Sequence, residues 1–136
     1  MRVRAQALVE FAAVITLLLL LLAGIVDVVR AVTAYTYLDH AAQEGALYGV
    51  VHPTDTAGLE TRVRETLQTV FPDPANVDVA VTYLDQPCPG HFIQVTVTGR
   101  MVLIFPFAEL FVADRAITLT AQAQQIILSN GAASCP

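Results

Sequence analysis

The chain begins with a long apolar segment that has an acidic residue at each end. Within residues 11–26 only Thr16 and Gly24 are not apolar, and Glu10 and Asp27 flank this stretch. A helix needs about 20 apolar residues to cross roughly 30 Å of hydrocarbon, and apolar neighbours on either side bring the segment close to that length. The pattern predicts a membrane-spanning helix with the two acids near opposite interfaces.

Helix-compatible sequence continues beyond this segment to Val51. Apolar or small residues recur every three or four positions, as on one face of an amphipathic helix: Val28, Val32, Tyr35, Leu38, Ala42, Ala46 and Gly49. We therefore expect one helix from about Gln6 to Val51, close to ~70 Å long. Its N-terminal half suits lipid or other helices, and its C-terminal half suits a globular domain on one side. Gly45 and Gly49 permit close approach, which we assign to packing against that domain rather than to a helix–helix contact.

The rest of the chain predicts a short helix followed by three strands. The segment HPTDTAG breaks the first helix, and residues 59–71 then place apolar residues on one helical face. Strand-like alternation covers residues 77–84, 92–104 and 116–128, with an apolar connection before the third strand. In that strand four apolar residues alternate with threonine and glutamine: Ile117, Leu119, Ala121 and Ala123. The expected fold is α+β, with a three-stranded antiparallel sheet packed on the long helix.

The charge balance limits the classes of function. The 136 residues include 7 basic residues, all of them arginine, and 12 acidic residues, for a formal net charge of −5. This composition does not favour a nucleic-acid partner. Because Arg2 and Arg4 precede the apolar segment, the positive-inside rule predicts a cytoplasmic N-terminus and an exported remainder. A cleaved secretory signal peptide is the competing interpretation, but the apolar core is long for one and no small-x-small cleavage site follows it.

Few residues offer chemistry of their own. Cys88 and Cys135 lie in loop-like or terminal sequence, and an even cysteine count in an exported domain favours a disulfide between them. His40, His52 and His91 lack the spacing of metal ligands. No phosphate-binding loop, nucleophile–base pattern or catalytic carboxylate pair is evident, so we predict no enzyme, no cofactor and no metal site.

The sequence RAQALVEFAAVITLLLLLLAGIVDVVR, followed by AAQEGALYG and a proline, resembles the TadE-like family of pilin-related proteins. The similarity is dense over about the first fifty residues, and AITLTAQAQQ is similar to the family's closing strand. The resemblance implies a type IV pilin-like organisation. Residues 1–5 would be a leader, residues 6–30 a transmembrane and assembly helix, and residues 31–136 a globular α+β domain in which 31–51 continue the helix.

The resemblance also implies cleavage by a prepilin peptidase, which cuts before a segment with glutamate at its fifth position. Counting back from Glu10 places the cut between Ala5 and Gln6, with alanine where the commonest family pattern has glycine. The new α-amine of Gln6 could then be neutralised by Glu10 of a neighbouring helix, which would favour one axial register. Phe11 lies beside Glu10 in the same assembly segment. In the simpler interpretation, Glu10 lies at the headgroup level and contacts only water.

These implications lead to the expectation of a membrane-inserted subunit that assembles into an extracellular filament, a pilus with roles in adhesion or secretion at the cell surface. Its partners would be further copies of itself, a prepilin peptidase, an assembly ATPase and a membrane platform. Whether the subunit is major or minor stays open. One alternative is a permanently anchored single-span protein whose exported domain binds a partner or has a priming role. Another is a secreted domain released by signal peptidase.

Overall fold

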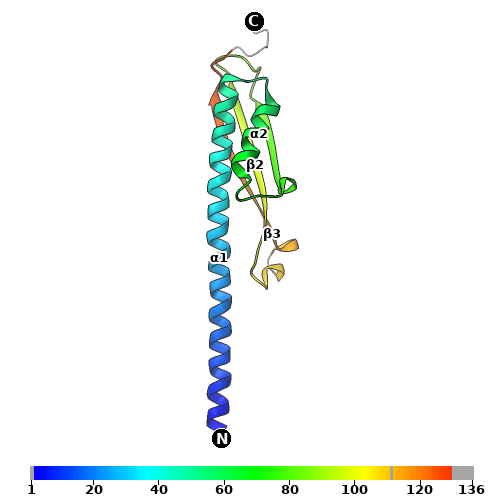
Figure 1. Ribbon diagram of the computed structural model, residues 1–136. Helices are drawn as coiled ribbons and strands as arrows, with labels where there is room; N and C mark the ends of the chain where they lie inside the picture. The colour runs from blue at the N-terminus through cyan, green and yellow to red at the C-terminus, as the bar shows by residue number, and fades with distance from the viewer. Residues whose placement is uncertain (1, 111, 130–136) are drawn as a thin grey trace.

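One helix runs the length of the molecule, and all other elements lie along its C-terminal half (Figure 1). The computed structural model describes residues 2–110 and 112–129. The elements are helices α1 (Arg2–Val51) and α2 (Thr56–Leu67), strands β1 (Val77–Tyr83), β2 (Phe92–Val102) and β3 (Ala116–Ile126), and the 3-10 turns η1 (Pro74–Asn76), η2 (Ala108–Leu110) and η3 (Ala113–Arg115). The expected α+β fold is confirmed.

The three strands form an antiparallel meander in the order β1-β2-β3. Val97 of β2 pairs with Val79 on one side and with Ala121 on the other, and the inner face of the sheet consists of such small or branched apolar residues. The outer face is mostly polar. There the hydroxyl oxygens of Thr98 and Thr120 lie 3.3 Å apart. The alternation predicted for the third strand is therefore confirmed.

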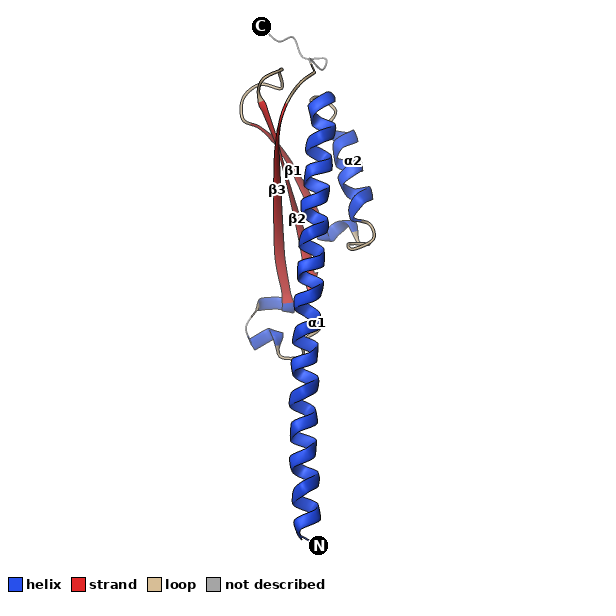
Figure 2. Ribbon diagram, turned by 90° about the vertical axis from the view of Figure 1, so that its left-hand side faces the viewer, coloured by secondary structure: helices blue, strands red, loops and turns tan. Residues whose placement is uncertain are grey.

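Helices α1 and α2 cover the same face of the sheet, so the domain has two layers (Figure 2). Fully or almost fully buried side chains from both helices and the sheet meet in one cluster, which includes Leu38, Ala42, Leu59, Val63, Leu67, Ile93, Val95 and Val97. The other face of the sheet stays open. The domain is thus a thin layer held against the C-terminal half of α1.

Two predicted boundaries differ for reasons that lie in single hydrogen bonds. Helix α2 begins before residue 59 because Asp55 caps it, with Oδ1 accepting the Gly58 N–H at 2.9 Å. Strand β2 ends at Val102 rather than at Ile104 because the Ile104 and Phe105 amides turn away from the sheet and donate to Asp27 on α1.

The predicted apolar stripe of α1 is correct only in its C-terminal part. Leu38, Ala42, Ala46 and Gly49 are buried, but Val28, Val32 and Tyr35 are 63%, 61% and 49% exposed. In this part of the helix the face toward the sheet carries Asp27, Ala31 and Ala34 instead. Small side chains let the strands approach the helix closely, whereas the larger valines lie on surface that the domain leaves uncovered.

Gly45 and Gly49 pack inside the domain, as predicted. A Cβ atom added to Gly45 would lie 2.6 Å from Val63 Cγ2 and 3.4 Å from Val95 Cγ1, so α2 and β2 both approach the bare backbone. A Cβ atom added to Gly49 would collide with Ile93 Cδ1. These glycines serve close packing of helix, helix and sheet.

The close approach at Gly45 predicts a loss of stability in Gly45→Val. Forcing a branched side chain against buried Val63 should lower the free energy of unfolding of the domain by about 1–3 kcal/mol. Gln43→Val places the same residue on an exposed position of the same helix, where the change should stay within about 0.5 kcal/mol. Urea unfolding in detergent, followed by circular dichroism, measures both. Equal unfolding midpoints for the two variants would contradict the packing described here.

Candidate functional site

The N-terminal half of α1 extends beyond the domain (Figure 1), and most of its apolar side chains are exposed. We call residues 8–26 the bare half of α1. Within the described part of the chain, one helix is long and apolar enough to cross a membrane, and it contains this segment. In water, such a surface would favour burial in lipid or against other apolar helices.

Glu10 lies at the start of the bare half, where its side chain is exposed. Its Oε1 accepts a hydrogen bond of 3.3 Å from the Gln6 side-chain amide one turn earlier. Phe11, the next residue, is also exposed. The structure therefore brings Gln6 and Glu10 together on one face of α1, while the side chain of Ala5 is outside the described residues. The proposed cleavage and the assembly role of Glu10 and Phe11 remain predictions.

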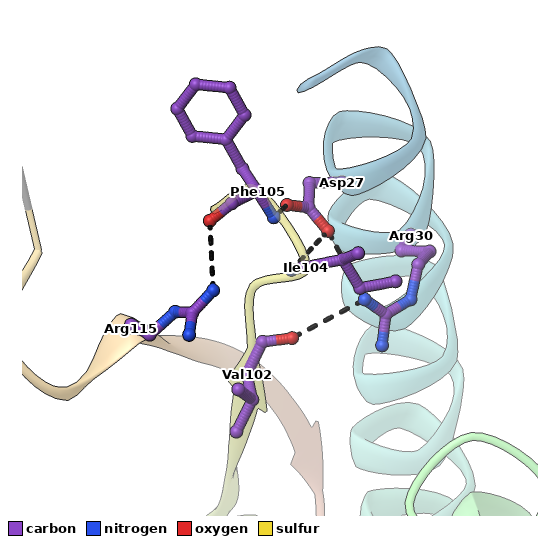
Figure 3. Close-up of polar contacts among 6 residues, drawn as sticks. All are labelled: Asp27, Arg30, Val102, Ile104, Phe105 and Arg115. Carbon is purple, nitrogen blue, oxygen red and sulfur yellow. Dashed lines mark hydrogen bonds and ion pairs between the residues drawn. The ribbon is translucent and has the colours of Figure 1, made fainter. Parts of the chain in front are cut away.

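At the other end of the bare half, Asp27 is buried, with only 5% of the residue exposed. Its Oδ1 accepts the Ile104 N–H at 3.0 Å, and its Oδ2 accepts the Phe105 N–H at 2.7 Å (Figure 3). Both amides belong to the connection between β2 and β3, residues 103–115, which we call the basal loop. Both carboxylate oxygens are thus satisfied by backbone donors that lie 77 and 78 residues away in sequence.

Two arginines complete this contact. Arg30 lies one turn above Asp27, with Nη1 3.3 Å from Asp27 Oδ1 and 3.4 Å from the Val102 carbonyl oxygen. Arg115, at the end of the basal loop, donates from Nη2 to the Phe105 carbonyl at 3.5 Å, and its own carbonyl accepts the Leu103 N–H at 2.7 Å. The two arginines hold the loop from both sides, so Asp27 is the centre of a network rather than an isolated pair (Figure 3).

The basal loop returns to β3 through a strained backbone. Asp114 and Arg115 have φ angles of 57° and 52°, in the left-handed region that residues other than glycine seldom adopt. Two such residues in succession cost free energy and persist only where the surrounding contacts hold them. The contacts of Asp27, Arg30 and Arg115 therefore keep the loop in one shape at one height along α1.

From the sequence, Asp27 was expected only to mark the membrane interface, and residues 105–114 were expected to be a connection. The partners of Asp27 could not be found from the sequence because backbone amides carry no residue-specific signal. A signal for the contact was nevertheless present. A carboxylate at the edge of an apolar run must reach water or a partner. This requirement holds for Asp27 as well as for Glu10.

The remaining candidates lie apart from this network. Cys88 is buried in the loop between β1 and β2, whereas Cys135 lies outside the described residues, so their disulfide stays a prediction. His52 stacks on Tyr48, with ring centroids 4.7 Å apart. The His91 Nδ1 atom lies 3.2 Å from Asp85 Oδ2. The described residues contain no group of three or more metal-binding side chains.

A long apolar helix that carries a small α+β domain on its C-terminal half fits, by length and composition, a protein with one candidate membrane span in the described residues. Residues 5–47 match the model of the family described as TadE-like protein, which confirms the resemblance for this part of the chain. The match ends within α1, before α2 and the sheet. No curated protein and no solved structure matches the chain. The family match and the long apolar helix fit a membrane protein related to the Tad pilus, and the family itself consists of pilus-associated structural components.

The network around Asp27 predicts a local effect of Asp27→Ala. Removing the carboxylate leaves the Ile104 and Phe105 amides without their acceptor, at a cost of about 1–3 kcal/mol to the local structure. Hydrogen exchange at these two amides should therefore become faster, while the buried amides of β2 change little. Asp27→Asn keeps one side-chain oxygen that can accept, and its exchange rates should fall between those of the parent and the alanine variant. Unchanged exchange in Asp27→Ala would show that the loop does not depend on Asp27.

Proposed function

We propose that the chain is a pilin-like subunit that is inserted in the cytoplasmic membrane, cut between Ala5 and Gln6, and assembled through α1 into an extracellular filament. The bare half of α1 would form the core of the filament, and the sheet-bearing domain would lie on the outside. Further copies of the chain, a prepilin peptidase, an assembly ATPase and a membrane platform would be its partners. The N-terminus would start in the cytoplasm and the domain outside it.

One observation carries this proposal: the exposed apolar surface of α1 extends past the level at which a membrane would end. If Asp27 lies at the outer edge of the hydrocarbon, Val32 and Tyr35 lie about 8 and 12 Å farther out. The headgroup layer is only about 5–8 Å deep on each side. Both side chains are half-exposed or more and do not face the sheet. A permanent single span would leave Tyr35 in water above the headgroups, whereas neighbouring helices in a filament would cover this surface.

Glu10 has a defined task in this proposal. After cleavage, Gln6 would carry an α-amine that is positively charged near neutral pH. In an apolar bundle the Glu10 carboxylate of one subunit would pair with the amine of the next, and a shifted neighbour would leave a buried charge unpaired at a cost of about 3–5 kcal/mol. The pairing would favour one register between subunits. The contact between Gln6 and Glu10 within one chain supports this arrangement, because it already places both residues on one face.

The experiment that tests the proposal is Glu10→Ala in cells that produce the native protein. We expect membrane insertion to persist, because alanine is easier to insert than glutamate, and surface filaments to fall to background. Glu10→Gln should give the same loss, because it keeps the shape of the side chain and removes the charge. Val9→Ala, a matched change at an exposed neighbouring position, should retain filaments.

Membrane fractionation measures insertion, and electron microscopy of sheared surface material measures filament assembly. Normal filaments from Glu10→Ala would refute the register role. Filaments absent in the parent chain itself, with the protein stable in membranes, would favour the permanently anchored alternative.

A further inference from the structure

The basal loop is the part of the domain that lies nearest to the bare half of α1 (Figures 1 and 2). The hydrogen bonds that the Ile104 and Phe105 amides donate to Asp27 fix this position. Both residues therefore lie at the height of the first charged residue after the apolar run. Strand β2 starts far away, where Ile93 packs on Gly49, and it descends along α1 to Arg30. If the bare half crosses a bilayer, the basal loop therefore reaches the outer headgroup layer.

Apolar side chains project from this loop without partners in the domain. Ile104, Phe107 and Leu110 are 57%, 49% and 76% exposed. Phe105 and Phe107 also contact each other edge to face, with ring centroids 6.0 Å apart. Such a group of side chains, next to a helix segment that could cross a membrane, is a surface that an apolar phase can cover.

Several backbone amides of the basal loop have hydrogen-bond partners within the protein, which suits a region with little water. The Ala108 amide donates to the Phe105 carbonyl and the Leu110 amide to the Phe107 carbonyl, at 3.1 Å each. The Ile104 and Phe105 amides donate to Asp27. The Leu103 amide donates to Arg115. These bonds lower the cost of bringing the loop to the edge of the hydrocarbon, where an unsatisfied peptide group costs several kcal/mol.

The charges around the loop balance one another. Each acid has an arginine within 4 Å: Asp27 with Arg30 at 3.3 Å, Glu109 with Arg115 at 3.6 Å, and Asp114 with Arg100 at 3.7 Å. The surface is thus neither an anion-binding nor a cation-binding patch. This balance suits a zwitterionic lipid headgroup, which also carries both charges.

We propose that Ile104, Phe107 and Leu110 of the basal loop insert into the outer interface of the membrane while the subunit is held there by its helix. The occupant of this surface is phospholipid. The loop then acts as a second, shallow membrane contact beside the helix and sets how deep α1 lies and how the domain is oriented on the bilayer. This inference needs the helix in the membrane, but it needs neither cleavage nor polymerisation.

The chain contains no tryptophan, so a single substitution creates a unique fluorescent probe. The full chain carrying Phe107→Trp is reconstituted in phosphatidylcholine vesicles, and parallel vesicles contain lipid brominated in the upper part of the acyl chains. We expect a blue-shifted emission that brominated lipid quenches and that aqueous acrylamide quenches poorly. Leu110→Trp, at a more exposed position, provides a second probe should the first variant fold badly.

Leu84→Trp is the matched control. Leu84 is 56% exposed and directly follows β1 at the opposite end of the domain, near the C-terminal end of α1. Its emission should be quenched by acrylamide and not by brominated lipid. The same control result from Phe107→Trp or Leu110→Trp would overturn the inference. Protection from acrylamide without quenching by brominated lipid would also overturn it, because another copy of the chain would then cover the loop.

Adding Glu10→Ala to Phe107→Trp separates this inference from the proposed function. The double variant should show the same quenching by lipid, because Glu10 acts only in assembly. Loss of filaments with retained quenching would leave the membrane contact standing. Loss of filaments without quenching would overturn the membrane contact and leave the assembly role of Glu10 standing.

Discussion

The contact between Asp27 and two amides of the basal loop decides where along α1 the domain ends. The other end is fixed where Gly49 lies under Ile93, about 33 Å away along the helix axis. Between these points the small residues of α1 let the strands lie close to the helix. Below Asp27 most apolar side chains of α1 stay exposed, so one buried carboxylate marks the boundary between the part of the helix that packs within the chain and the part that has few contacts with it.

The two parts of α1 follow different packing rules, and this decides what could be predicted from the sequence. The bare half is recognisable because residues 11–26 are apolar in every direction. The packed half was harder to assign because the buried face depends on size as well as on hydropathy. Ala31 and Ala34 face the sheet, whereas the more hydrophobic Val28 and Val32 do not. The pattern at Leu38, Ala42 and Ala46 was predicted correctly, since all three are buried against the domain.

The sheet was predictable because period-2 alternation along β3 has a single physical cause, one buried and one open face. The site was only half predictable. Gln6 and Glu10 were found through their local spacing, but the partners of Asp27 are peptide groups more than seventy residues away. Their identity emerges only once β2 is placed beside α1. The same placement brings the apolar connection, with its exposed Ile104, Phe107 and Leu110, to the height of Asp27 on α1.

The central claim is that this subunit leaves the membrane as a processed chain. It is tested most directly by the intact mass and N-terminal sequence of the native protein in sheared, sedimenting surface material. A chain that starts at Gln6 in that fraction is the predicted result. A chain that still starts at Met1 and occurs only in membranes would contradict the claim and identify α1 as a permanent anchor.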